Sequence, residues 1–245
     1  MSDEERLAEG SLISHLVELR QRLLKCVIAV AIVFAPCGWF ANDLFTIIAT
    51  PLIAKMPAGS SMIATSLISP FTAPLKLSFF VALFIAMPVV LYQVWQFVAP
   101  GLYKREKRLA IPLLISSILL FYSGIAFAYF IVFKVMFGFF VGVTPTGVDM
   151  TPDISAYLSF VLGIFLAFGL AFEVPIATVL LIWSGLVSVT TLKKVRPYMF
   201  LGAFVAGMLL APDVFSMTLM AIPMYLLYEG GLIMARVLIP EKAAT

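Results

Sequence analysis

Two acidic side chains stand among basic residues in a very apolar chain. Glu18 lies in His15-Leu-Val-Glu-Leu-Arg20, and Glu106 lies in Leu102-Tyr-Lys-Arg-Glu-Lys-Arg108. Cytoplasmic edges of membrane proteins are rich in Lys and Arg, so an acid within such an edge is a candidate acceptor for a cationic ligand. A carboxylate can hold an arginine side chain through two parallel hydrogen bonds, which a lysine cannot form. These two residues are the best indication of chemistry in the sequence.

Each of these carboxylates also has a structural interpretation. Glu106 can pair with a neighbouring Lys or Arg in a solvated loop, where an ion pair contributes about 0–1 kcal/mol. Glu18 can pair with Arg22, four residues later in the same helix and in the favourable order for such a pair. Both interpretations stay open at this stage.

Glu173 is a third candidate, because it interrupts an apolar run at Phe172-Glu-Val-Pro175. It lies about ten residues, or about 15 Å along a helix, from the inner end of its expected segment. An acid at that depth usually faces a cavity, a partner or a proton path. The alternative is a protonated carboxyl group in a packed interior.

The composition indicates a membrane protein that spans the bilayer several times. Of the 245 residues, 62% are hydrophobic and 12% are charged, and the mean hydropathy is +1.10. A bilayer core needs about 20 helical residues. We therefore expect an all-α polytopic protein, one membrane domain over residues 1–245, with outer segments at 41–75 and 138–153. Its six expected helices lie at about 23–40, 76–97, 110–137, 154–183, 197–211 and 214–236.

Two further patterns describe the arrangement of these helices. The last two helices are short, since 16 residues separate Arg196 from Asp213 and 15 residues separate Asp213 from Glu229. The alternative is that helix six continues to Arg236, with the Glu229 carboxylate extending to the membrane interface. Prolines within helices two, four and six predict bends, with an interruption at Pro223 and a concave wall overall. Placing both termini in the cytoplasm puts 13 of the 16 Lys and Arg residues on that side, as the positive-inside rule requires.

Enzymatic chemistry is not expected. The sequence contains one histidine, two cysteines and no HExxH or GxSxG motif, so the parts of a zinc site or a nucleophilic centre are missing. No cofactor or metal is predicted.

Seven ordered motifs between residues 12 and 236 resemble the TatC family, the multi-spanning core of the twin-arginine protein translocase. They are His15–Arg20, Ser69-Pro-Phe71, Leu91-Tyr-Gln-Val-Trp-Gln-Phe97, Ala99–Arg108, Phe127-Ala-Tyr-Phe130, Ala167-Phe-Gly169 with Phe172–Pro175, and Ala211-Pro-Asp213. The resemblance implies a receptor, not an enzyme, in the inner membrane. Such a receptor binds Arg-Arg signal peptides of folded precursors, self-associates, and works with TatA-like and TatB-like single-span partners under the protonmotive force.

The resemblance also assigns residues to two sites. The signal-peptide site comprises Glu18, Arg20, Phe97, Leu102, Tyr103 and Glu106. The intramembrane and partner-docking positions comprise Pro51, Tyr129, Glu173, Met208 and Asp213. A rival interpretation is an ion-coupled transporter of small solutes that uses Glu173. Such transporters usually show inverted repeats and broken helices at the midplane, and the sequence indicates neither.

Overall fold

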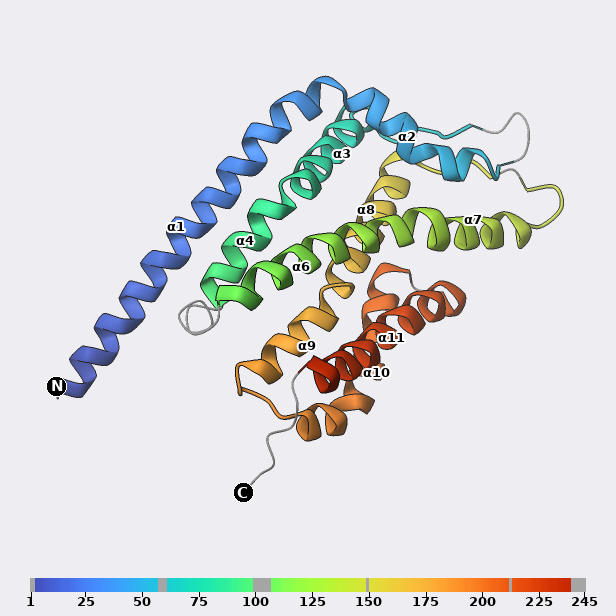
Figure 1. Ribbon diagram of the computed structural model, residues 1–245. Helices are drawn as coiled ribbons and strands as arrows, with labels where there is room; N and C mark the ends of the chain where they lie inside the picture. Colours follow the sequence, from blue (N-terminus) through green and yellow to red (C-terminus); the bar gives the residue numbers. More distant parts are fainter. Residues whose placement is uncertain (1–2, 57–60, 99–106, 149, 212, 239–245) are drawn as a thin grey trace. The chain divides into compact units, whose positions relative to one another are not determined.

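The structure is a computed structural model that describes residues 3–56, 61–98, 107–148, 150–211 and 213–238 (Figure 1). Within these ranges the chain is helical, and its one extended pairing is a parallel bridge between Ile63 and Asp153. The predicted all-α class is confirmed.

The described helices follow one another in the order of the predicted segments. They are α1 (Asp3–Trp39), α2 (Ala41–Ile53), α3 (Ser69–Ile85), α4 (Met87–Val98), α6 (Lys107–Phe127), the π-helix η1 (Ala128–Val132), α7 (Phe133–Gly142), α8 (Ile154–Ala171), α9 (Val174–Trp183), α10 (Val189–Leu210) and α11 (Val214–Leu238).

Among the described residues, four helical stretches are long and apolar enough to cross a membrane. They are Leu16–Trp39, Ile111–Gly142, Ile154–Trp183 and Val214–Leu238, and the bent pair α3–α4 makes a fifth. The segment expected as helix five, residues 197–211, corresponds to the apolar end of α10, whose first turns carry Lys193, Lys194 and Arg196. It is not among these span candidates, so the count of six membrane-spanning helices remains a prediction.

One expected bend is present, and the helix is interrupted at a second of the expected positions. Helices α3 and α4 meet at 53° around Ala86, just before Pro88, whose ring cannot be accommodated beside the carbonyl group four residues earlier. A second break separates α8 from α9 at Phe172 and Glu173, before Pro175. The predicted interruption at Pro223 is absent, because α11 continues through it to Leu238.

The chain forms two compact units: residues 1–42 with 75–118, and residues 43–74 with 119–245. In the first unit, α1 runs along α4 (Figure 1). In the second unit, α9, α10 and α11 pack together. A Cβ atom on Gly231 would lie 2.8 Å from the Cα atom of Pro175. Glycine therefore allows α9 and α11 to approach at backbone distance, a packing mode common between membrane helices.

Candidate functional site

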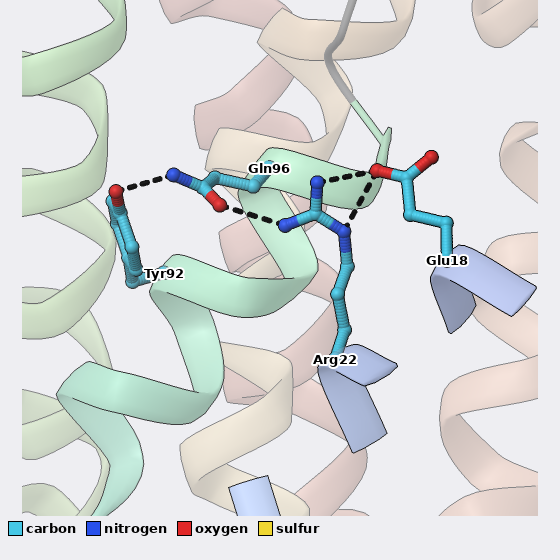
Figure 2. A network of polar contacts seen from close by, with 4 residues as sticks. All are labelled: Glu18, Arg22, Tyr92 and Gln96. Carbon is cyan, nitrogen blue, oxygen red and sulfur yellow. Dashed lines mark hydrogen bonds and ion pairs between the residues drawn. The ribbon is translucent and has the colours of Figure 1, made fainter. Parts of the chain in front are cut away.

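A chain of four polar side chains joins α1 to α4 in the first unit (Figure 2). The Arg22 Nε atom donates to Glu18 Oε1 at 2.9 Å, and Arg22 Nη2 makes an ion pair with the same oxygen. Arg22 Nη1 donates to Gln96 Oε1 at 2.7 Å, and Gln96 Nε2 in turn donates to the Tyr92 hydroxyl group. The guanidinium group thus fixes Glu18 relative to α4.

The Glu18 carboxylate remains accessible although Arg22 holds it. The Glu18 side chain is 41% exposed, whereas that of Arg22 is 17% exposed. Both recorded contacts end on one carboxylate oxygen, and the second oxygen points away from Arg22 (Figure 2). The structural interpretation of Glu18 is therefore correct as far as the pairing goes, yet the arrangement leaves room for a further cation.

The other predicted signal-peptide residues divide between described and undescribed parts of the chain. Arg20 is exposed on α1, and Phe97 is half-buried on α4 beside Gln96. Leu102, Tyr103 and Glu106 lie outside the described residues. The structure thus places one of the two predicted carboxylates.

Pro51 and Tyr129, two of the predicted docking positions, are connected through one carbonyl group. Pro51 lies inside α2, and a proline cannot donate the N–H that the carbonyl group four residues earlier would accept. That carbonyl group belongs to Ile47, and the Tyr129 hydroxyl group donates to it at 3.2 Å. Tyr129 lies in the π-helix η1, an irregularity that is frequent at functional sites.

Glu173 lies at the break between α8 and α9, inside the apolar stretch Ile154–Trp183. Its side chain is half-buried. Its backbone N–H donates to Leu170, and its carbonyl group accepts from Ala177, so the break keeps its hydrogen bonds. The acid is consequently positioned by a helix junction rather than by a regular helix.

The remaining two docking positions have different surroundings. Met208 is 51% exposed on α10. The Asp213 carboxylate accepts the Ser216 backbone N–H at 2.7 Å, which is the bond expected of a residue that caps the following helix.

Asp153 was not among the predicted site residues, although its carboxylate joins two segments of the second unit. Its Oδ1 atom accepts the N–H groups of Ser155 and Ala156, and its Oδ2 atom accepts the N–H and hydroxyl groups of Thr65. Hydrogen bonds to the charged form, above all from the Thr65 side chain, lower the pKa of Asp153 from 3.8 to about 2. Asp153 therefore caps α8 and ties it to the segment before α3.

A second ion pair links α10 to α11. Arg196 Nη2 lies 2.6 Å from Glu229 Oε2, and the Tyr225 hydroxyl group donates to Glu229 Oε1 at 2.9 Å. Glu229 is 23% exposed and lies within α11, which continues beyond it. In the sequence, Arg196 and Glu229 each border an apolar run. Their pairing could not be predicted from it, because the two positions are 33 residues apart and no spacing rule relates them.

Sequence comparison matches most of the chain to one family of known proteins. The family described as Sec-independent protein translocase protein (TatC) matches residues 14–223. The chain is 59% identical over 221 residues to the Sec-independent protein translocase protein TatC of Azotobacter chroococcum mcd 1, covering 90% of this chain and 87% of the relative. The protein of the same name from Escherichia coli K12 is 57% identical over 226 residues, covering 92% and 88%.

A solved structure gives the same result in three dimensions. It is described as the crystal structure of the twin-arginine translocase receptor TatC, and it superimposes with a TM-score of 0.83 at 42% identity, covering 91% of this chain and 98% of the other. The sequence match and the shared helical fold extend over nearly the whole length. The chain therefore belongs to the TatC family.

Proposed function

We propose that this chain is the core subunit of a twin-arginine protein translocase and the receptor for Arg-Arg signal peptides. It binds the signal peptides of folded precursor proteins at its cytoplasmic face. With TatA-like and TatB-like partners, it then mediates export driven by the protonmotive force. Family membership supports this proposal, since the matching solved structure is described as a twin-arginine translocase receptor.

The observation that carries the receptor role is the Glu18 carboxylate, which Arg22 orients on one side and which is 41% exposed. A carboxylate held in place loses less side-chain entropy on binding than one that rotates freely. Glu18 would accept one guanidinium group of the signal, and Glu106 would accept the other. Arg20, Phe97, Leu102 and Tyr103 would contact the peptide around these two acids.

The localisation follows the distribution of charge. The apolar helices indicate a multi-pass membrane protein. We place both termini in the cytoplasm of a cell whose inner membrane holds the protein, because this orientation puts most Lys and Arg residues inside. We propose that partner helices dock around Glu173, Met208 and Asp213, and that Pro51 and Tyr129 support that region.

The test is site-specific photo-crosslinking in native membranes, with the crosslinker at Val17 or Leu19 beside Glu18. Both side chains are exposed, at 50% and 44%. A precursor with an Arg-Arg signal is compared with its Lys-Lys twin. Crosslinks to the Arg-Arg precursor alone are expected, because only arginine matches the planar carboxylate with two bonds.

A crosslinker at Ile32, exposed further along the same helix, serves as the control and should label neither precursor selectively. Equal labelling of both precursors from Val17 and Leu19 would remove arginine recognition from this part of α1. The receptor role would then have to lie elsewhere in the chain.

A further inference from the structure

The first compact unit contains an apolar groove with a volume of about 620 Å³. Helix α1 contributes Leu23, Val27 and Phe34 to its wall, α3 contributes Phe79 and Leu83, and α4 contributes Val90. The volume falls within the range of about 300–1,000 Å³ that is typical of ligand sites. The groove is open along its length, since Leu23 is 62% exposed, Val27 56% and Phe79 46%.

The length of the groove wall on α1 matches the depth of one bilayer leaflet. A charged side chain at the bilayer centre is costly, so Arg20, Arg22 and Lys25 mark the membrane surface on α1. Leu23 lies at that surface, and Phe34 lies 11 residues further, or about 16 Å along the helix axis. One leaflet of a hydrocarbon core of about 30 Å is about 15 Å deep. The stripe from Leu23 to Phe34 is therefore about as long as one leaflet is deep.

A cation stands at the surface end of the same helical stripe. Residues 20, 23, 27, 30 and 34 recur at intervals of three and four, and such residues share one face of a helix. Arg20 is exposed and precedes Leu23 by one turn. A guanidinium group binds the oxygens of a phosphate group as it binds a carboxylate.

We propose that this groove binds one phospholipid, with an acyl chain along Leu23–Phe34 and its anionic phosphate at Arg20. Both the length and the charge favour this occupant. A transmembrane helix from a partner or a second copy would need a surface about 30 Å long, twice the depth of the groove. The lipid would fill the apolar space beside the helix that carries Glu18, and this assignment does not depend on the proposed receptor role.

The test uses the full chain in vesicles containing phosphatidylglycerol with a photoactivatable group in one acyl chain. Adducts are then mapped by mass spectrometry of peptides. Val27→Trp should narrow the groove and lower labelling of the Leu23–Phe34 wall several-fold. Ile28→Trp is the matched control, because Ile28 is also 56% exposed but does not line the groove.

The headgroup contact is tested with Arg20→Gln. Its labelling by the phosphatidylglycerol probe should fall about fivefold, the effect of one basic residue near an anionic lipid surface. Labelling by a diacylglycerol probe with the same acyl chains, which has no phosphate group, should not fall. Equal loss for both probes would overturn the phosphate contact at Arg20.

Two results would overturn the acyl-chain site itself. One is labelling that is equal on the groove wall and on the opposite face of α1 at Ile32, and that Val27→Trp does not change. Bulk lipid would give this result. The other is labelling of the Ile32 face with none in the groove, which would show that a protein segment covers the groove. Thermal unfolding of each variant confirms that the compared proteins are folded.

Discussion

At the scale of single residues, the Glu18 carboxylate combines a fixed position with an accessible oxygen. Glu18 and Arg22 lie four residues apart on one helix, and ion pairs with this spacing contribute only about 0.3–0.5 kcal/mol. Glu18→Gln should therefore change the thermal unfolding midpoint in detergent very little, while crosslinking to an Arg-Arg precursor falls severely. Glu18→Asp keeps the charge and should retain part of the binding. A loss of crosslinking that follows the loss of stability would make Glu18 a structural residue.

The shared carbonyl group of Ile47 predicts an energetic coupling between Pro51 and Tyr129. Tyr129→Phe removes the donor and should lower the free energy of unfolding by about 0.5–1.5 kcal/mol, the net contribution of one hydrogen bond. In a Pro51→Ala background, residue 51 regains its N–H and can serve the same carbonyl group. The cost of Tyr129→Phe should then shrink, and a double-mutant cycle in thermal unfolding measures the difference.

Tyr157→Phe provides the matched control for this cycle. The Tyr157 hydroxyl group donates to the carbonyl group of Ile48 at 2.7 Å. The residue four positions after Ile48 is Leu52, which has a backbone N–H in both backgrounds. The cost of Tyr157→Phe should not depend on Pro51; equal coupling for both tyrosines would rule out the proposed explanation.

At the scale of helices, Arg196 and Glu229 join α10 and α11 near the ends of their apolar stretches. Glu229→Gln should lower the free energy of unfolding by about 1–2 kcal/mol, because a charge-assisted bond is lost and Arg196 is left unpaired. Exchanging the two residues, Arg196→Glu with Glu229→Arg, should restore part of the stability in a thermal unfolding experiment. If the exchanged protein is no more stable than the worse single variant, the pair does not hold the two helices together.

The cap at the start of α8 predicts a dependence of stability on pH. The pKa of Asp153 is about 2 in the folded chain, below its ordinary value of 3.8, so its contribution is fully present above about pH 4. It is lost as the pH falls from there through 2. Asp153→Asn should lack this part of the acid sensitivity, measured as the difference in unfolding midpoint between the two proteins from pH 6 to pH 2.

Thr65→Val tests the cause of that dependence. It removes the hydroxyl donor at 2.7 Å from the Asp153 carboxylate. When both proteins carry Thr65→Val, the pH-dependent difference in unfolding midpoint between the protein with Asp153 and the Asp153→Asn variant should become smaller. An unchanged difference would assign the acid sensitivity to other carboxyl groups.

At the scale of the whole molecule, the two proposed sites lie in different compact units of the chain. Glu18 belongs to the first unit and Glu173 to the second. We expect Glu173→Gln to weaken crosslinking to a TatA-like partner in membranes while leaving crosslinking of the Arg-Arg precursor at Val17 nearly unchanged. Normal partner crosslinking and normal export would make Glu173 a structural residue.

Sequence patterns predicted the helical class, but they predicted the details of each helix less well. Proline chemistry predicted the breaks before Pro88 and Pro175, but it wrongly predicted one at Pro223, where α11 remains continuous. Local rules also suggested the pairing of Glu18 with Arg22, since both lie on one helix. They could not suggest Gln96 or Tyr92, because those contacts depend on how α4 lies against α1.

The sequence by itself determined that the chain is an apolar helical membrane protein of the TatC family, because hydropathy, proline positions and short motifs are local properties. Only the tertiary structure decided which distant polar groups meet. It joined Arg196 to Glu229, Thr65 to Asp153, and Tyr129 to the carbonyl group that Pro51 leaves without its helical donor. Such contacts depend on the packing of whole helices, and the spacing of residues along the chain does not encode that packing in a form that local rules can read.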